Sequence, residues 1–305
     1  MQSVGADTRA PRDGRGAITA ELVEALVAAQ FPQWAGLRVV PVPEDGWDNR
    51  SYRLGEALSV RLPSAAAYVA AVAKEDRWLP WLAPQLPLQV PQPVATGRAG
   101  PGYAWSWSVR RWIPGRPVAA GPVPDPTALA RDLARFLTVL WSLDATDGPP
   151  PGPHCFERGG PPAFYDGEVR ESLDALDGRL DRAACEAVWT EALASTWTAS
   201  PVWFHGDVAP GNLLLDSAGD LTAVIDFGTC GVGDPACDLV IAWTLLPDAA
   251  RDAFREAVDL DPATWARARG WALWKALIML AADRADAPGH RGVVDAVLAD
   301  HAARG

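Results

Sequence analysis

An amide and a carboxylate, Asn212 and Asp226, lie at the open end of a predicted hairpin, one on each strand. The apolar runs Leu213–Leu215 and Leu221–Ile225 are separated by a polar, glycine-containing turn, which is typical of two antiparallel strands. Pairing outward from a turn centred near residue 218 or 219 places Asn212 roughly opposite Ile225 or Asp226. Amide and carboxylate oxygens are ligands for a hard divalent cation such as Mg²⁺. The sequence therefore predicts that Asn212 and Asp226 hold a metal ion.

A further carboxylate, Asp207, lies on the loop that enters this hairpin. A carboxylate in that place can accept a hydrogen bond from a hydroxyl group and orient it for in-line attack on phosphorus. The alternative interpretation is an ordinary loop and hairpin that carry surface acids. Taken together, the three side chains indicate phosphoryl transfer, with Asp207 serving the acceptor and Asn212 and Asp226 serving the metal.

The flanking sequence predicts an α+β protein of two lobes. An antiparallel sheet with helices comes first, a Pro- and Gly-rich segment at 114–124 follows, and the rest is mainly helical. Helices are expected at 19–30, at 65–78 (ending near Pro80), from Asp125 past Leu140, from Asp234 toward Trp243, and at 249–258, 262–285 and 292–303. Strands are expected at 37–42, 50–54, 58–62 and 103–111. We therefore expect a flexible leader at 1–16, an N-terminal nucleotide-binding lobe at 17–113 and a C-terminal catalytic and acceptor-binding lobe at 114–305.

The net charge of −11 and the pI near 4.8 argue against nucleic acid as a partner. The acidity is uneven, since residues 1–143 carry 12 acids and 15 bases and residues 144–305 carry 26 acids and 12 bases. Such a field fits solvated helix faces, and it also fits a lobe that concentrates a cationic substrate.

Cysteine spacing and hydropathy indicate the cellular compartment of the protein. The four cysteines show no metal-binding pattern, so reduced thiols are expected. The first 16 residues lack the apolar run of a signal peptide, and the longest apolar stretch, near 271–282, is interrupted by Lys275. We expect a cytoplasmic protein that does not enter a membrane and is a monomer or a weak dimer.

Three motifs resemble the aminoglycoside phosphotransferase family, which is similar to protein kinases in fold. They are His205-Gly206-Asp207 with Asn212, then Ile225-Asp226-Phe227-Gly228, then Asp234-Pro235 with Asp238-Leu239, and weaker similarity extends over about residues 20–285. The resemblance implies that Asp207 is the catalytic aspartate and that Asn212 and Asp226 hold Mg²⁺. It also implies that His205 supports the loop from beneath and that Asp238 braces it through backbone hydrogen bonds.

The phosphate donor must be held without a phosphate-binding P-loop, because no such motif occurs in the chain. In kinase-like folds a strand lysine pairs with a helix glutamate and reaches the phosphates. Here Arg61 occupies the expected place and Glu75 is its expected partner, although Arg61 also fits an ordinary surface arginine. Gly46-Trp47-Asp48-Asn49 resembles the hairpin tip over the phosphates, and Arg111-Trp112-Ile113 is expected to offer backbone groups to the base of ATP or GTP.

The acceptor is expected to be a small molecule with a hydroxyl group. Because the second lobe is acidic, the leading expectation is a cationic aminoglycoside-type antibiotic, which would make the protein a resistance enzyme. A macrolide or a choline- or homoserine-like metabolite is the alternative, and a catalytically silent nucleotide-binding protein is a further one, supported by the missing strand lysine. Trp243, Trp271 and Trp274 either line a pocket or pack in the core. The acidic candidates for acceptor binding are Asp147, Glu157, Asp166, Glu168, Asp283 and Asp286.

Overall fold

The computed structural model describes residues 16–43, 48–282 and 287–304, and the chain divides into two compact units. The first unit comprises residues 1–114 and 223–228, and the second comprises residues 115–222 and 229–305. The change of unit after Pro114 lies where the Pro- and Gly-rich link begins. Residues 223–228, which were expected in the second part of the chain, group with the first unit. The expected leader lies outside the described residues, apart from Gly16.

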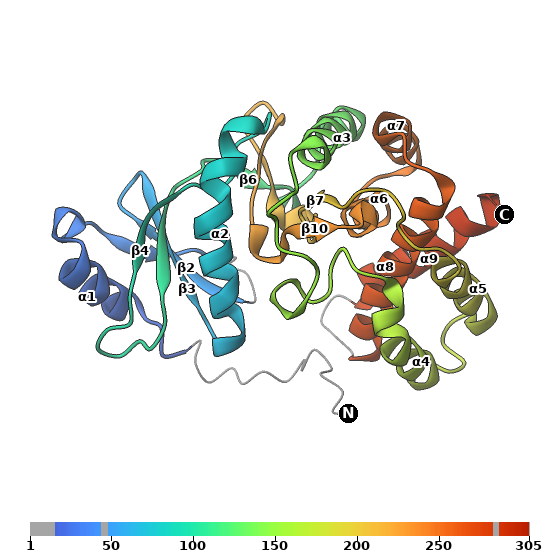
Figure 1. The fold of residues 1–305 in the computed structure, drawn as a ribbon, viewed down its shortest axis with the longest axis horizontal. Coiled ribbons are helices and arrows are strands. Elements are labelled where there is room, and N and C mark those ends of the chain that lie inside the picture. Colours follow the sequence, from blue (N-terminus) through green and yellow to red (C-terminus); the bar gives the residue numbers. More distant parts are fainter. Residues whose placement is uncertain (1–15, 44–47, 283–286, 305) are drawn as a thin grey trace. The chain divides into compact units, whose positions relative to one another are not determined.

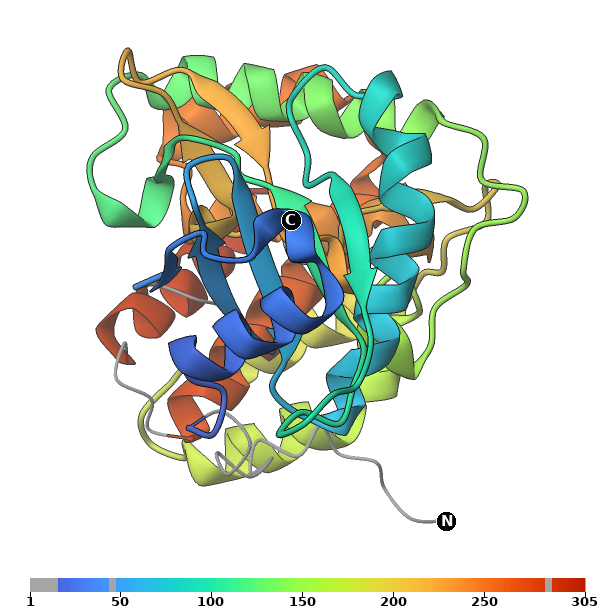
Figure 2. The ribbon, with the colours of Figure 1, turned by 90° about the vertical axis from the view of Figure 1, so that its left-hand side faces the viewer.

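The first unit is built on an antiparallel sheet of five strands within the described residues (Figures 1 and 2). Their order in space is β1, β2, β3, β5, β4, so each of the first three pairs with the strand next to it in sequence. The strands are β1 (Val39–Pro41), β2 (Asn49–Leu54), β3 (Leu58–Pro63), β4 (Pro93–Gly97) and β5 (Trp107–Arg111), and the helices are α1 (Ala20–Gln30) and α2 (Val69–Leu82).

The two faces of this sheet differ in chemistry because successive side chains of a strand point in opposite directions. On one face, Val60 pairs with Val109 and packs in an apolar core with Val23 and Leu26 of α1. On the other face, Arg61 pairs with Ser108 and lies toward α2. Figure 1 shows α1 and α2 on opposite sides of the strands. The sheet thus has an apolar face under α1 and a charged face under α2.

Helix α2 runs further than the sequence predicts. It was expected to end near Pro80, but it continues to Leu82, and the backbone N–H of Ala83 donates to the carbonyl of Leu79. Proline lacks an N–H and therefore removes one helical hydrogen bond. The extra turn buries Leu79 and Leu82 completely, and this apolar burial outweighs the missing bond.

The predicted strand at 103–111 was also too long. Tyr103 pairs only with Gly100, and the two exchange backbone hydrogen bonds of 2.9 Å, closing a turn in which Gly102 has a φ of +81°. Strand β5 starts at Trp107, and its partner β4 was not predicted, because Val94 to Thr96 offers only one alternation of apolar and polar residues.

The second unit is mainly helical. Helix α3 (Pro126–Ser142) begins at the predicted cap Asp125 and buries the predicted face of Leu129, Leu133, Phe136, Leu137 and Leu140. Helix α8 (Pro262–Ala281) is buried along most of its length and packs against α4, α5 and α9. The remaining helices are α4 (Asp166–Ala175), α5 (Arg182–Leu193), α6 (Ile241–Thr244), α7 (Asp248–Val258) and α9 (Ala287–Arg304).

Short strands connect these helices. The predicted hairpin is present as β8 (Leu213–Leu215) and β9 (Leu221–Val224), and Asp216 caps its turn by accepting hydrogen bonds from three backbone N–H groups. Strand β6 (Arg116–Pro117) pairs with β8, and β7 (Val202–Phe204) pairs with β10 (Gly231–Gly233). The segment after Asp234, expected to start a helix, forms a 3₁₀ turn over Pro235–Val240 before α6. The expected α+β architecture in two parts is confirmed.

All four cysteines are buried, and none of them forms a disulfide bond. Among the described residues, every helix is too short or too polar to span a lipid bilayer.

Candidate active site

The loop that carries Asp207 follows strand β7 and is held by a buried carboxylate. Asp238 accepts the backbone N–H of Gly206 at 2.7 Å, the backbone N–H of His205 at 3.1 Å and the indole N–H of Trp141 at 3.1 Å. Burial raises the pKa of Asp238, while these three donors favour its charged form. Gly206 has a φ of +84°, and a Cβ there would lie 2.7 Å from the carbonyl oxygen of Thr229. The loop conformation therefore depends on both Asp238 and Gly206.

Asn212 and His205 fix the position of Asp207 within this loop. The backbone N–H of Asp207 donates to Nδ1 of the buried His205 at 3.2 Å. The amide nitrogen of Asn212 donates to the backbone oxygen of Asp207 at 2.9 Å and to its carboxylate at 3.3 Å. Because the nitrogen of the amide is used in this way, its oxygen is the atom of Asn212 that remains for a cation.

The carboxylate of Asp207 is ionised and faces a cation. Nζ of Lys275 on α8 lies 2.7 Å from Oδ1 of Asp207. Burial alone would raise the pKa of Asp207, but Lys275, followed by Arg158 and His205, lowers the pKa to about 2. Asp207 is therefore charged at neutral pH and can accept a hydrogen bond from a hydroxyl group.

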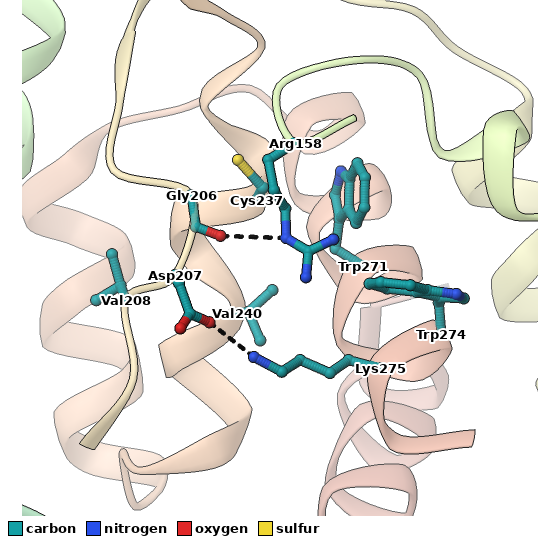
Figure 3. A pocket seen from close by; sticks show the side chains of 9 residues that line it. All are labelled: Arg158, Gly206, Asp207, Val208, Cys237, Val240, Trp271, Trp274 and Lys275. Atoms are coloured by element: carbon teal, nitrogen blue, oxygen red, sulfur yellow. Dashed lines mark hydrogen bonds and ion pairs between the residues drawn. The ribbon is translucent and has the colours of Figure 1, made fainter. Parts of the chain in front are cut away.

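A pocket opens beside Asp207 in the second unit (Figure 3). It encloses about 280 Å³, part of which is open to solvent. Two indole rings from α8 and two cationic side chains form much of its wall. The lining residues are Arg158, Gly206, Asp207, Val208, Cys237, Val240, Trp271, Trp274 and Lys275.

Arg158 lies over the aromatic wall of the pocket. Its guanidinium carbon is 5.1 Å from the ring centroid of Trp271 and 4.6 Å from that of Trp274. Nε of Arg158 donates to the backbone oxygen of Gly206 at 3.2 Å, which ties it to the Asp207 loop. Tyr165 stacks behind Trp274 at 3.9 Å between centroids. Figure 3 shows Nε of Arg158 directed toward the Gly206 carbonyl and the ammonium of Lys275 directed toward Asp207.

The acidic residues expected to bind an acceptor are not among the residues that line this pocket. Asp166 accepts hydrogen bonds of 2.8 Å from Arg170 and from the indole of Trp189. Glu168 accepts from the indole nitrogen of Trp274 at 3.0 Å. Asp147 is exposed, Glu157 is partly buried with a φ of +55°, and Asp283 and Asp286 lie outside the described residues.

In the first unit, Arg61 joins residues from three segments. Its Nη2 lies 2.5 Å from Oδ1 of Asp226, and its Nη1 lies 3.6 Å from Glu75. The amide oxygen of Asn49 accepts from Nε and Nη2 of Arg61 at 3.0 and 2.9 Å. Burial alone would lower the pKa of Arg61, but Asp226 and Glu75, with a smaller contribution from Asp48, raise it. Gly46 and Trp47 lie outside the described residues.

The bidentate partner of Glu75 is Arg110, which sequence reasoning missed. Nη1 and Nη2 of Arg110 donate to the two carboxylate oxygens of Glu75, each at 3.0 Å. Burial would raise the pKa of Glu75, but Arg110 and then Arg61 lower it to about 2. Arg110 is two residues from Ser108 on the predicted strand, so strand alternation placed it on the face of Arg61 and was the signal that could have found it.

Two of the backbone N–H groups expected to contact a nucleobase already form hydrogen bonds within the first unit. The N–H of Arg111 donates to Gln92 at 3.0 Å, and that of Trp112 donates to Ala57 at 2.8 Å. The guanidinium carbon of Arg53 lies over the ring of Trp112, 4.9 Å from its centroid. Ile113 follows without secondary structure, and base recognition by Arg111, Trp112 and Ile113 stays a prediction.

The predicted metal ligands lie in different units, Asn212 in the second and Asp226 in the first. Oδ1 of Asp226 meets Arg61, and among the described residues its other oxygen has no hydrogen-bond donor. Asp226 adopts a φ of +66°, a left-handed conformation that few residues other than glycine, asparagine and aspartate tolerate. Among the described residues no group of three His, Cys, Asp or Glu side chains could bind a metal by itself. Two oxygen donors suit Mg²⁺, which keeps several waters and binds substrate phosphates, so the Mg²⁺ site stays a prediction.

Comparison with known proteins gives the family of the chain. A family profile described as the phosphotransferase enzyme family matches residues 39–271. A search of curated protein sequences finds no match.

Solved structures share the fold at low sequence identity. The GDP complex of wild-type aminoglycoside 2′-phosphotransferase-IIIa has a TM-score of 0.69 at 17% identity, covering 92% of this chain and 99% of that one. The GDP and kanamycin complex of APH(2″)-IIIa has a TM-score of 0.67 at 18% identity, covering 93% and 99%. The macrolide 2′-phosphotransferase MphH from Brachybacterium faecium has a TM-score of 0.55 at 22% identity, covering 91% and 97%. Because the family profile spans most of the sequence, the chain belongs to the phosphotransferase enzyme family.

Proposed function

We propose that the protein transfers the γ-phosphate of a nucleoside triphosphate to a hydroxyl group of a small molecule, and that Asp207 orients this hydroxyl. The observation that carries the proposal is an ionised carboxylate at the edge of a pocket, on a loop fixed by Asp238, His205 and Asn212. Such a group supplies the positioning that phosphoryl transfer requires from a protein.

The reaction forms a bond between the acceptor oxygen and the γ-phosphorus and breaks the bond from that phosphorus to the bridging oxygen. The nucleoside diphosphate leaves with the electron pair. With a pKa of about 2, Asp207 is a weak base. The hydroxyl proton therefore leaves late, onto the transferred phosphoryl group, whose second pKa is about 6. In this mechanism Asp207 acts mainly by orienting the hydroxyl oxygen toward phosphorus.

The proposed phosphate donor is ATP or GTP, held by the cluster around Arg61. Arg61 is positively charged and is aligned by Asn49 and Glu75, with Asp48 close by. The oxygen of Asn212 and the second oxygen of Asp226 would hold Mg²⁺, which supplies positive charge to the phosphates when bound. Nucleotides appear in the names of similar structures, which are complexes with GDP, ADP or ATP. Because the four cysteines are buried thiols outside any disulfide bond, we propose that the protein works in the reducing, nucleotide-rich cytoplasm.

Two acceptor classes follow from the sequence, an aminoglycoside-type antibiotic and another small alcohol. Similar structures include complexes with kanamycin, gentamicin and streptomycin and also macrolide phosphotransferases. The pocket beside Asp207 has two cationic side chains, Arg158 and Lys275, and no carboxylate besides Asp207 among its described lining residues. This charge favours another small alcohol over a polycation.

The substitution Asp207→Asn tests the proposal. We expect it to reduce transfer of labelled phosphate from ATP or GTP, in the presence of Mg²⁺, by about 10²-fold or more. Nucleotide affinity measured by calorimetry should change little. Asp220→Asn, on the exposed hairpin turn, is the matched control. Equal turnover in Asp207→Asn and the wild type would contradict the proposal, and so would the absence of Mg²⁺-dependent turnover of nucleotide in the wild type, which would instead support a catalytically silent protein.

A further inference from the structure

The pocket beside Asp207 carries a net positive charge. Its described lining holds one carboxylate and two cations, and that carboxylate already contacts Lys275 at 2.7 Å. Arg158 forms no ion pair with these residues, although its charge acts on Asp207. A ligand in this pocket therefore meets a cationic surface, although the second part of the chain is strongly acidic in sequence.

The guanidinium of Arg158 is fixed in place but incompletely hydrogen-bonded. Nε is held by the carbonyl of Gly206, and the planar group lies over Trp271 and Trp274. Its Nη1 is buried and has no hydrogen-bond acceptor among the described residues. A buried cationic donor without an acceptor is costly, and an anionic oxygen ligand would remove that cost.

Three carboxylates of the second unit form ion pairs away from the pocket. Asp234 pairs with Arg267 at 2.6 Å, and Asp166 pairs with Arg170 at 2.8 Å. Asp300 binds three arginines, namely Arg255, Arg269 and Arg304. These three carboxylates are held by arginines, and none of them lines the pocket. The excess of acids in the second part of the chain therefore does not place a second carboxylate among the described lining residues.

Building on the proposed function, we propose that the acceptor is an alcohol that also carries a carboxylate. Arg158 binds the carboxylate with its free donors, Asp207 holds the hydroxyl group, and the indole rings of Trp271 and Trp274 flank the carbon skeleton. Two N–H groups of a guanidinium match the two oxygens of a carboxylate in geometry. A polycationic acceptor would instead place ammonium groups beside Arg158 and Lys275, where like charges repel.

A matched set of three alcohols tests this assignment. They share one aromatic skeleton and one hydroxyl group and differ in a single substituent: para-(hydroxymethyl)benzoate, its primary amide, and the corresponding benzylamine. Binding is measured by calorimetry on the full-length protein with Mg²⁺ and a nucleoside diphosphate. We expect the carboxylate to bind at least about tenfold more tightly than the amide and the amine, the gain of one charge-assisted hydrogen bond. Equal or tighter binding of the amine overturns the proposal, and so does the absence of binding by all three at millimolar concentration.

Variants of Arg158 separate the ion pair from general effects on the pocket. Arg158→Met should abolish the preference for the carboxylate while leaving the weaker affinity for the amide unchanged, and Arg158→Lys should retain part of it. Arg182→Met, at an exposed arginine on α5, is the matched control for loss of an arginine. If Arg158→Met weakens the carboxylate and the amide equally, Arg158 has a structural role and the proposal fails. Thermal unfolding of each variant identifies misfolding, in which case Arg158→Lys alone decides.

The same measurements distinguish this proposal from the proposed function. Phosphoryl transfer to any neutral alcohol, abolished by Asp207→Asn, would support the function and contradict the carboxylate preference. Carboxylate binding that depends on Arg158, without Mg²⁺-dependent turnover of nucleotide, would support the binding site and contradict the function.

Discussion

Glu75 accepts two parallel hydrogen bonds of 3.0 Å from Arg110, and neither side chain is accessible to solvent by more than 3%. Arg61 also reaches Glu75, but at 3.6 Å. The two arginines therefore have different roles. Arg110 neutralises Glu75, whereas Arg61 bridges Glu75, Asn49 and Asp226.

The first prediction concerns the stability of this buried pair. Glu75→Gln leaves Arg110 as a buried charge without its counterion, which should lower the free energy of unfolding by about 3–5 kcal/mol. The double variant Glu75→Met/Arg110→Met should recover much of this loss, because apolar residues often replace a buried ion pair at little cost. Urea unfolding at neutral pH measures both effects. Glu56→Gln, in the exposed pair with Arg53, is the control and should change stability little. A double variant no more stable than Glu75→Gln would count against the argument.

The second prediction is a pH dependence. The pKa of Glu75 is about 2 in the folded protein, against about 4.3 in an unfolded chain. A lowered pKa stabilises the fold fully above the unfolded value, and this stabilisation is lost as the pH falls from about 4.3 toward 2. Asp207, with a pKa of about 2, contributes in the same direction. Acid titration followed by tryptophan fluorescence should show a weaker loss of stability in the Glu75→Met/Arg110→Met variant. Identical pH profiles for this variant and the wild type would contradict the prediction.

The third prediction tests what Arg61 does for the nucleotide. Arg61→Met should weaken nucleotide binding by about tenfold or more, because a charge directed at the phosphates is lost. Arg61→Lys should lie between the wild type and Arg61→Met, because it keeps the charge but loses the planar fork that meets Asn49 and Asp226. Calorimetry with ATP and GTP measures the affinities. Arg38→Met, at an exposed position of the first unit, should bind as the wild type does. Unchanged affinity in Arg61→Met would show that Arg61 is an ordinary arginine of the sheet.

The fourth prediction concerns the brace beneath the catalytic loop. Asp238→Asn leaves one oxygen to accept from Gly206, His205 and Trp141, so at least one buried N–H loses its acceptor. We expect stability to fall by about 1–3 kcal/mol. Turnover should fall by about 10²-fold, because small displacements of a positioned group cost that much. Nucleotide affinity should remain close to that of the wild type, since Asp238 lies in the loop support and not in the Arg61 cluster. Asp248→Asn, at an exposed carboxylate on α7, is the control. Wild-type turnover in Asp238→Asn would contradict the prediction that Asp238 positions the catalytic loop.

Local patterns in the sequence predicted the elements well. The cap at Asp125 and the spacing of Leu129 to Leu140 fixed the start and the buried face of α3, because a helix repeats every 3.6 residues. The polar, glycine-containing turn between two apolar runs likewise predicted the hairpin of β8 and β9. Both predictions rest on residues that are close in the chain.

Contacts between residues far apart in the chain have no corresponding pattern in the sequence, so they were not predicted. Lys275 contacts Asp207, which lies 68 positions away in the sequence. Arg158 contacts Gly206, which lies 48 positions away. The total charge of the second part predicted an acidic acceptor site, but it could not show that Asp166, Asp234 and Asp300 are paired with arginines. The charge around Asp207 is set by packing and not by composition.

The four buried thiols make the protein suited to site-specific labelling. Burial raises the pKa of Cys185 to about 11 and also raises that of Cys237, so both are protonated and unreactive at neutral pH. Phe164 is 53% exposed, and its neighbour Tyr165 stacks on Trp274 in the wall of the pocket. A fluorophore attached through Phe164→Cys would therefore report the arrival of an acceptor in real time, with every native cysteine left in place.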